Sequence, residues 1–496
     1  MDPTLGIDET MGSMTDTVNK QQPRATENRS TVPGDSAFTT YIQQHWADRD
    51  EASPEPRAAA APAAARRGQL SERFTGRAMV VVAGEYKVRS NDTDYPFRAH
   101  TNFSYLTGWG ADSVPGSVLV MAPAADGHEA TLFFRERATR TEREFYANPE
   151  IGEFWTGPRP SLAHVAADLG IAVRPLTELD TVLAELDDAV LVTGEADSTV
   201  DRVVTDRDAD ASAELATVLS EMRLVKDAYE VAELQRAVDA TQLGFDDMVA
   251  DLEAATAHPR GERLLEGTFF RRARMEGNEL GYSTIVGAGS NACYLHWVRN
   301  DGTVGSDDLV LIDAGVEVES LYTADITRTL PVSGTFSPVQ RRVYDAVLEA
   351  ADYAFSIVKP GITFRDVHAA AMEVIARKVA EWGLLPVTAE ESLDPSGQQH
   401  RRYMVHGTSH HLGLDVHDCA QARREMYMDG IVEEGMVFTI EPGLYFQADD
   451  LTVPEELRGI GVRIEDDILV TADGARNLSA GIPRTADAVE AWVGGA

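Results

Sequence analysis

The stretch "LIDAGVEVESLYTADITRTL", from Leu311 to Leu330, places two aspartates within segments that otherwise have the apolar character of β-strands. Asp313 follows the run Leu-Val-Leu-Ile, and Asp325 opens the next strand-like segment after a polar interval. Two strands joined by a turn would bring both carboxylates to one end of a sheet. Because a buried ionised carboxylate is costly unless it is paired or binds a metal ion, this stretch predicts a charged site on a sheet.

Two further acids stand in strand contexts closer to the C-terminus. Glu441 follows Val-Phe-Thr-Ile in "FTIEPG", and Glu465 lies between Ile464 and another apolar run in "GVRIEDDILV". Each acid alone has an ordinary explanation as a turn residue or a solvated side chain. Four of them, together with the histidine-rich stretch "HGTSHHLGLDVHD" (His406–Asp418), favour a cation site instead.

Carboxylates and imidazole form a hard, oxygen-rich ligand set that suits Mn, Mg, Co or Fe. The set holds more carboxylates than one ion needs, which indicates two ions roughly 3.5–4 Å apart that share some of them. Such a pair generates a bridging hydroxide and stabilises both oxygens of a tetrahedral intermediate. The reaction class predicted from these residues is metal-assisted hydrolysis.

The length and composition of the chain limit which classes of protein it can belong to. The chain has 496 residues, which predicts two domains with extensions. Its formal net charge of −37 argues against a nucleic-acid partner and against an anionic membrane surface. The cysteines Cys293 and Cys419 are too few for a disulfide framework and are typical of a reducing cytosol. With neither a signal peptide nor a long apolar run evident, we expect a cytoplasmic protein.

The pattern along the chain predicts three parts. Residues 1–68 are expected to form a flexible extension that ends in the Pro/Ala-rich linker "SPEPRAAAAPAAARRG" (Ser53–Gly68). Residues 69–222 alternate short apolar strands with helical segments, which predicts an α/β domain. Residues 223–496 place strand-like segments around a helical pair, which predicts a curved, mainly antiparallel α+β layer with helices on one face.

Several helices have recognisable starts. Apolar residues recur at helical spacing in "KDAYEVAELQRAVDATQLGFDDMVADL" (Lys226–Leu252), which predicts one long helix. Ser337 is an expected N-cap followed by Pro338 at the first helical position. Thr363 begins a capping-box pattern that predicts another helix ending near Gly383.

These motifs, in this order, resemble those of the pita-bread metallopeptidases, and the resemblance is strongest to the Xaa-Pro aminopeptidase (aminopeptidase P) family. It extends upstream to "YSTIVGAGSNACYLHW" (Tyr282–Trp297) and to "DYPFRAHTNFSYLTGW" (Asp94–Trp109). It covers roughly residues 70 to 490. The resemblance implies a creatinase-like N-terminal α/β domain and a catalytic α+β pita-bread domain.

The resemblance also implies roles for individual residues. Two Mn²⁺ ions per subunit would be bound by five side chains, with Co²⁺ or Zn²⁺ as alternatives: Asp313, Asp325, His410, Glu441 and Glu465. Glu441 would also orient or deprotonate the bridging water. The other matched positions are the substrate-side His296 and His417, the site-lining His406, and the supporting Arg463 and Tyr445. His411 matches no family role and is interpreted as a packed or solvated histidine.

The implied activity is release of the first residue from peptides with proline in the second position, by a homodimer or homotetramer. Three alternatives stay open: a prolidase that requires an Xaa-Pro dipeptide, a metal-independent creatinase-type hydrolase, and a non-catalytic binding protein. Ser409, where a prolidase is expected to have glycine, favours aminopeptidase P. The interval from Asp313 to Asp325 is one residue longer than in the family, which leaves the placement of these carboxylates open.

Overall fold

The computed structural model describes residues 33, 36–49, 52–91, 93–186, 190–194, 197–205 and 207–495. The chain divides into two compact units. The smaller unit comprises the described residues up to Asp48 together with those in Tyr86–Pro96 and Ala138–Gly157. The larger unit comprises the remainder and contains all the residues predicted to form the site.

The smaller unit contains short elements only among its described residues. They are α1 (Ser36–Ile42), β2 (Val88–Ser90), β3 (Thr93–Asp94), α4 (Glu144–Ala147) and α5 (Glu153–Thr156). The α1 helix packs through Phe38 on Tyr146, with ring centroids 5.6 Å apart. This ring contact holds α1 against α4.

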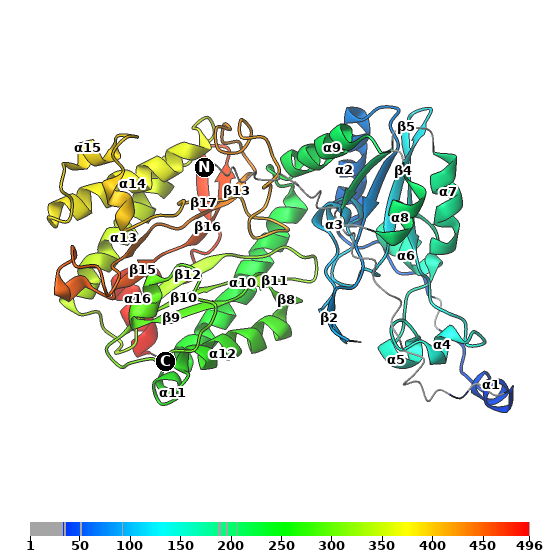
Figure 1. The fold of residues 1–496 in the computed structure, drawn as a ribbon, viewed down its shortest axis with the longest axis horizontal. Helices are drawn as coiled ribbons and strands as arrows, with labels where there is room; N and C mark the ends of the chain where they lie inside the picture. The colour runs from blue at the N-terminus through cyan, green and yellow to red at the C-terminus, as the bar shows by residue number, and fades with distance from the viewer. Residues whose placement is uncertain are drawn as a thin grey trace, which may run out of the picture. The chain divides into compact units, whose positions relative to one another are not determined.

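A five-stranded mixed sheet lies in the N-terminal part of the larger unit, in the order β6-β5-β4-β1-β7 (Figure 1). Its strands are β1 (Met79–Val82), β4 (Val118–Ala124), β5 (Gly127–Phe134), β6 (Ala172–Pro175) and β7 (Leu191–Gly194). Its helices are α2 (Ala60–Arg73), α3 (Thr101–Thr107), α6 (Leu162–Leu169), α7 (Leu179–Glu185), α8 (Ser198–Val203) and α9 (Ala209–Met222). Alternate residues of β1 enter different apolar clusters, because successive strand side chains point to opposite faces.

The linker predicted over Ser53–Gly68 is wrong from Ala60 onward, where α2 begins. Alanine has the highest helix propensity, and Pro62 is tolerated because it lies in the first helical turn. The helix buries Leu70 completely, and the Arg67 guanidinium donates to the carbonyl oxygen of Leu106 at 2.6 Å. The α2 helix is therefore part of the packed α/β layer.

The predicted helix starts are confirmed. The long helix α10 (Ala228–Ala250) has Asp227 as its N-cap in a capping box. The α13 helix (Pro338–Ile357) is capped by Ser337, and α14 (Phe364–Glu381) by Thr363. The side chains of Asp227 and Ser337 accept from backbone N–H groups that the first helical turn would leave unpaired, and at α14 the Asp366 carboxylate accepts from the Thr363 N–H at 2.8 Å.

The C-terminal part of the larger unit is built from antiparallel strand pairs, as predicted. The strands are β8 (Glu279–Leu280), β9 (Ile285–Ala288), β10 (Leu309–Ala314), β11 (Val316–Glu317), β12 (Ile326–Pro331), β13 (Val437–Ile440), β14 (Gly443–Tyr445), β15 (Gly461–Arg463), β16 (Asp466–Thr471) and β17 (Gly474–Asn477). The two three-stranded sheets have the orders β12-β10-β9 and β13-β16-β17.

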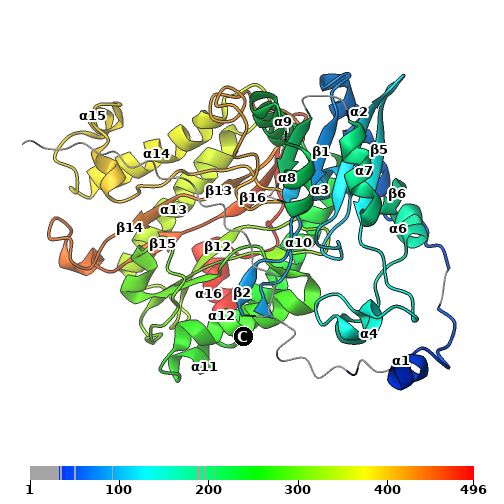
Figure 2. The ribbon, with the colours of Figure 1, turned by 45° about the vertical axis from the view of Figure 1, so that its right-hand side comes forward.

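Paired helices pack along these sheets (Figures 1 and 2). The α10 helix packs along α12 (Gly261–Glu276), which contacts β8 and β9, and α13 packs along α14 and contacts β13, β14 and β15. Shorter helices are α11 (Leu252–Thr256), α15 (Ala389–Leu393) and α16 (Ala486–Gly494), with 3₁₀ turns at Leu176–Glu178, Gly289–Cys293, Gln399–Arg402 and Glu455–Leu457. The strand ends that carry acidic residues lie at the interior of this arrangement.

Both cysteines, Cys293 and Cys419, are buried free thiols. No described helix combines the length and the apolar character needed to span a lipid bilayer.

Candidate metal centre and active site

The β10 and β12 strands pair in the hairpin that the quoted acidic stretch predicts, with Asp313 opposite Thr327. Asp313 and Asp325 are 7% and 5% exposed. The hydroxyl of Tyr282 lies 2.6 Å from a carboxylate oxygen of Asp313 and 2.6 Å from one of Asp325. The two acids therefore converge on one point, as the sequence predicts.

The interval between these aspartates contains a hydrogen-bonded turn. The backbone N–H of Leu321 donates to the carbonyl oxygen of Val318 at 2.8 Å, and that of Val318 donates to Tyr322 at 2.9 Å. Leu321 has φ +70°, a left-handed conformation that costs a residue with a β-carbon about 1 kcal/mol. The conformation is offset by burial of the leucine side chain, and the turn leaves Asp325 facing Tyr282.

The histidine-rich stretch forms backbone hydrogen bonds with β13 and with Glu441, the residue that follows it. The backbone N–H of Thr439 donates to His410 at 2.9 Å, and that of Glu441 donates to Thr408 at 2.8 Å. This pairing places His410 Nε2 3.1 Å from Asp325 Oδ2 and 3.8 Å from Glu441 Oε1. The imidazole therefore reaches one carboxylate just before β12 and another just after β13, strands of two different sheets.

Glu465 joins the site from the segment between β15 and β16. Its backbone N–H donates to the Thr327 carbonyl oxygen at 3.1 Å, and the Thr327 hydroxyl donates to its carboxylate at 2.7 Å. Ligand atoms of Asp325, His410 and Glu465 all lie within 4.8 Å of one another. We call the four carboxylates with His410 and Arg463 the acid site; its acids are Asp313, Asp325, Glu441 and Glu465.

Arg463 contacts this site from β15 and is 3% exposed. Its guanidinium forms an ion pair with Asp313 and donates to the Thr327 hydroxyl at 3.0 Å and to the Tyr445 hydroxyl at 3.2 Å. Arginine remains charged when buried, so it offsets part of the negative charge at all relevant pH values. One guanidinium does not neutralise four acids.

The electrostatics of the acid site reflect this excess of negative charge. Burial and then the neighbouring acids, chiefly Asp325, raise the pKa of Glu465 well above its ordinary value. Burial also raises the pKa of Glu441 to about 7, against the lowering effects of His410 and Arg463. Burial alone would lower the pKa of His410, but the hydrogen bond to Asp325 and the negative charges of Asp325 and Glu441 together raise it to about 9.

The side chains at this site fit divalent metal ions. Buried carboxylates that repel one another are stabilised by cations, and oxygen donors with one imidazole are ligands that Mn²⁺-type ions accept. The three ligand atoms that lie close together come from the residue before β12, from the histidine stretch and from the segment before β16. Because these segments lie far apart in the sequence, the tertiary fold brings the possible metal ligands together.

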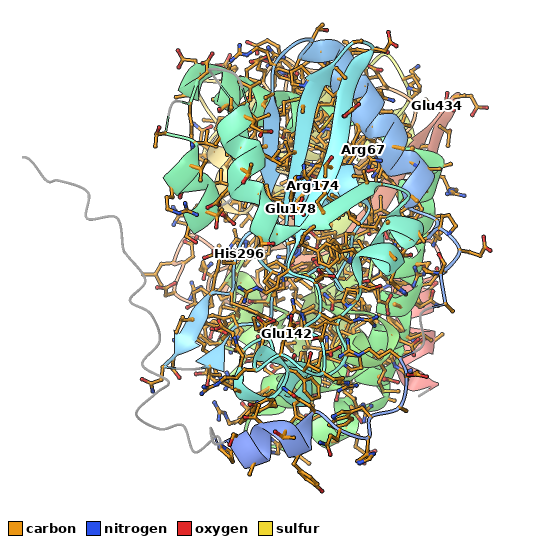
Figure 3. All side chains as sticks on the ribbon, turned by 90° about the vertical axis from the view of Figure 1, so that its right-hand side faces the viewer. Arg67, Glu142, Arg174, Glu178, His296 and Glu434 are labelled. Atoms are coloured by element: carbon orange, nitrogen blue, oxygen red, sulfur yellow. The ribbon has the colours of Figure 1, made fainter. Side chains whose placement is uncertain are left out.

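Two of the predicted substrate-side residues, His406 and His417, lie beside the acid site. His406 Nε2 lies 2.8 Å from the Tyr445 hydroxyl, and His406 Nδ1 lies 3.6 Å from Glu441 Oε2. The His417 ring lies 4.4 Å from the His410 ring and is exposed. His296, labelled in Figure 3, is also exposed, and it contributes to lowering the pKa of His417, after burial and His410.

His411 is packed, as interpreted from the sequence. It is 1% exposed, and its ring stacks on Phe364 with centroids 4.6 Å apart. Two contacts of the acid site were missed from the sequence. Tyr282 opens the quoted motif "YSTIVGAG" and could have been found there, whereas Thr327 has no local signal because its role depends on Glu465.

Two family models match the chain. The model described as metallopeptidase family M24 matches residues 232–472. The model described as the N-terminal domain of aminopeptidase P matches residues 63–191.

Individual proteins are similar over nearly the whole chain. Xaa-Pro aminopeptidase 1 of Streptomyces coelicolor is 51% identical over 475 residues, which cover 95% of each chain. A solved structure of an Escherichia coli aminopeptidase P variant in complex with substrate matches with a TM-score of 0.76 and 31% identity, covering 90% of this chain and 99% of that one. Proline aminopeptidase P II from Yersinia pestis matches with a TM-score of 0.75 and 33% identity, covering 88% and 99%.

Proposed function

The chain belongs to metallopeptidase family M24, and from that premise we propose that it releases the N-terminal residue from peptides with proline in the second position. The observation that carries this proposal is the convergence of four acids and His410 from segments far apart in the chain. Similarity to Xaa-Pro aminopeptidases over 95% of the chain supports the choice of substrate.

We propose that two Mn²⁺ ions bind here, with Co²⁺ or Zn²⁺ as alternatives. The proposed ligands are Asp313, Asp325, His410, Glu441 and Glu465. Divalent ions bound by these side chains supply a nucleophilic water at neutral pH and polarise a bound carbonyl group. The residues of the chain then orient the peptide and move protons.

Glu441 is proposed as the residue that transfers the proton. One of its carboxylate oxygens lies 3.8 Å from His410 Nε2, and the other lies 3.6 Å from His406 Nδ1. The carboxylate thus faces both the ligands and the predicted substrate side. From this position it can accept a proton at Oε1 or Oε2 and return it to the leaving proline nitrogen.

The exposed histidines are proposed to act on the peptide. His417 and His296 would donate to the carbonyl oxygen that gains negative charge as the peptide bond is attacked. His406 is held through Nε2 by the Tyr445 hydroxyl, which also accepts from Arg463. Burial and then Arg463 lower the pKa of His406 to about 3, so it would bind substrate as a neutral imidazole.

The remaining sequence predictions stay part of the proposal. They are a cytoplasmic location, a homodimer or homotetramer, and domains over residues 69–222 and 223–496. A prolidase is the rival function, because it would use the same ligand types on an Xaa-Pro dipeptide.

The test is cleavage of two peptides by the purified Mn²⁺-loaded protein, followed by mass spectrometry. One substrate is Ala-Pro, and the other is Ala-Pro-Ala-Ala with a free amine. Release of alanine from the longer peptide, lost on chelation and restored by Mn²⁺, is the expected result. Cleavage of the dipeptide alone would identify a prolidase, and cleavage of neither peptide would contradict the proposed function.

A further inference from the structure

Arg98 lies in the motif "DYPFRAHTNFSYLTGW", to which the proposed reaction assigns no task. Its Nε donates to a carboxylate oxygen of Glu317 at 2.6 Å. Its Nη2 donates to the Leu414 carbonyl oxygen at 2.5 Å. One guanidinium therefore joins β11, in the hairpin that carries Asp313 and Asp325, to the segment that leads to His417.

The segment Gly413–Asp418, which we call the His417 loop, is held at several points. The Thr101 hydroxyl donates to Asp415 at 2.6 Å, and Arg98 Nη1 lies 3.5 Å from the same carboxylate. At the other end of the loop, Arg223 Nε donates to the buried Asp418 at 2.8 Å. These contacts lie on both sides of His417.

His417 itself projects from between these anchored residues and is exposed. Its position relative to the acid site therefore depends on the backbone of the loop. Arg98 links that backbone to the hairpin through its side chain, next to the backbone N–H of Thr323, which donates to the Gly413 carbonyl oxygen at 3.1 Å. An arginine donates from three nitrogens set apart in a rigid planar fork, a spacing that the single ammonium nitrogen of lysine cannot reproduce.

We propose that Arg98 is a positioning residue, which sets the distance between His417 and the metal-binding hairpin. The N-terminal α/β part of the chain would thereby contribute directly to the geometry of the reaction. This inference rests on the proposed function for its kinetic consequence, since His417 is assigned a role there. Misplacing a reacting group by about 1 Å can cost about 10²-fold in rate.

The decisive variant is Arg98→Lys. Lysine keeps a positive charge beside Glu317, which is 4% exposed, so a purely structural ion pair is largely preserved. It gives up the simultaneous hydrogen bond to the Leu414 carbonyl oxygen. The matched control is Arg57→Lys, because Arg57 also pairs with two acids, Asp112 at 2.8 Å and Asp168, and is 26% exposed, against 34% for Arg98.

The first measurement is hydrogen–deuterium exchange of the Mn²⁺-loaded protein, for the peptide covering residues 412–419. Arg98→Lys should accelerate exchange in that peptide and leave residues 338–357 in α13 unchanged, while Arg57→Lys alters neither. Unchanged exchange at 412–419 in Arg98→Lys would overturn the inference. This arm is independent of activity, so it decides the inference even if wild-type protein cleaves no Xaa-Pro peptide.

The second measurement is kcat for Ala-Pro-Ala-Ala in a double-mutant cycle with His417→Ala. If Arg98 acts through His417, Arg98→Lys should lower kcat by about 10- to 100-fold in the wild-type background and by less than about 2-fold in His417→Ala. Equal losses in both backgrounds would show that Arg98 does not act through His417. Arg57→Lys should leave kcat unchanged in both.

Discussion

Glu465 and Asp466 are consecutive in the chain and are 1% and 3% exposed, yet their surroundings differ. Glu465 faces the acid site, where three other carboxylates share the environment with Arg463. Asp466 instead lies 2.7 Å from Arg328 Nη2 and 2.9 Å from Arg484 Nε, and accepts a hydrogen bond from Ser479. We call Arg328, Asp466 and Arg484 the ion-pair cluster.

The difference is visible in the pKa values of the two acids. Burial and repulsion from Asp325 raise the pKa of Glu465 well above its ordinary value. At Asp466 burial alone would raise the pKa, but attraction to Arg328 and then Arg484 lowers it. The ion-pair cluster is thus balanced by the chain's own cations, whereas the acid site gains most from cations supplied from outside.

The largest expected effect is the response of the acid site to metal. Chelation should reduce peptide cleavage below detection, and Mn²⁺ should restore it and raise the melting temperature. A ligand that binds only the native state contributes about 2.7 kcal/mol at one hundred times its Kd. Differential scanning fluorimetry with and without Mn²⁺ measures the shift. The surface variant Asp180→Asn, which removes an exposed ion pair with Arg202, should respond to Mn²⁺ like the wild-type protein. If Mn²⁺ left the melting temperature of the wild-type protein unchanged, the assignment of the acid site as a metal site would be contradicted.

Glu441→Gln should lower kcat by about 10²–10⁴-fold, because an amide cannot transfer the proton. In the metal-free protein it should leave the melting temperature unchanged or raise it, since it removes one of four mutually repelling charges. Steady-state kinetics and thermal melts in chelator test the two parts. Substantial turnover in this variant would remove Glu441 from the proton-transfer role.

The same acid-to-amide change at Asp466 should have the opposite effect on stability. Asp466→Asn leaves Arg328, which is fully buried, without its carboxylate partner, and breaking a buried pair costs about 3–5 kcal/mol. Urea denaturation gives the free energy of unfolding. Asp180→Asn is again the control, with an expected change of at most about 1 kcal/mol. If Asp466→Asn were no more destabilising than this control, the contrast between the two regions would fail.

The smallest expected effect is a pH dependence of the metal-free protein. The pKa of Glu441 is raised from 4.5 to about 7, so between these values the native state binds more protons than the unfolded state. Stability should therefore fall as pH rises from about 4.5 to about 7. Mn²⁺ displaces these protons, so its stabilising shift should grow with pH. Melting temperatures at pH 5 and pH 7.5 test this; parallel pH profiles with and without Mn²⁺ would be inconsistent with it.

Much of the fold could be predicted from local pattern. The N-caps Ser337 and Thr363 lie where the sequence predicts them, because the capping box joins residues three positions apart. The start of α2 was missed because a Pro/Ala-rich stretch is compatible with a linker or with a helix. Packing of Leu70 and Arg67 decides in favour of the helix.

The sequence by itself determined that acids stand in apolar strands, and the cost of burying them predicts a cation site. Local sequence could not determine which acid faces which partner. Glu465 and Asp466 have similar chemistry and adjacent positions. Their partners, Thr327 for Glu465 and Arg328 for Asp466, lie more than 130 residues away in the sequence. Tertiary structure decided their roles, because the free energy of a buried charge depends on the groups that the fold brings within a few ångströms of it.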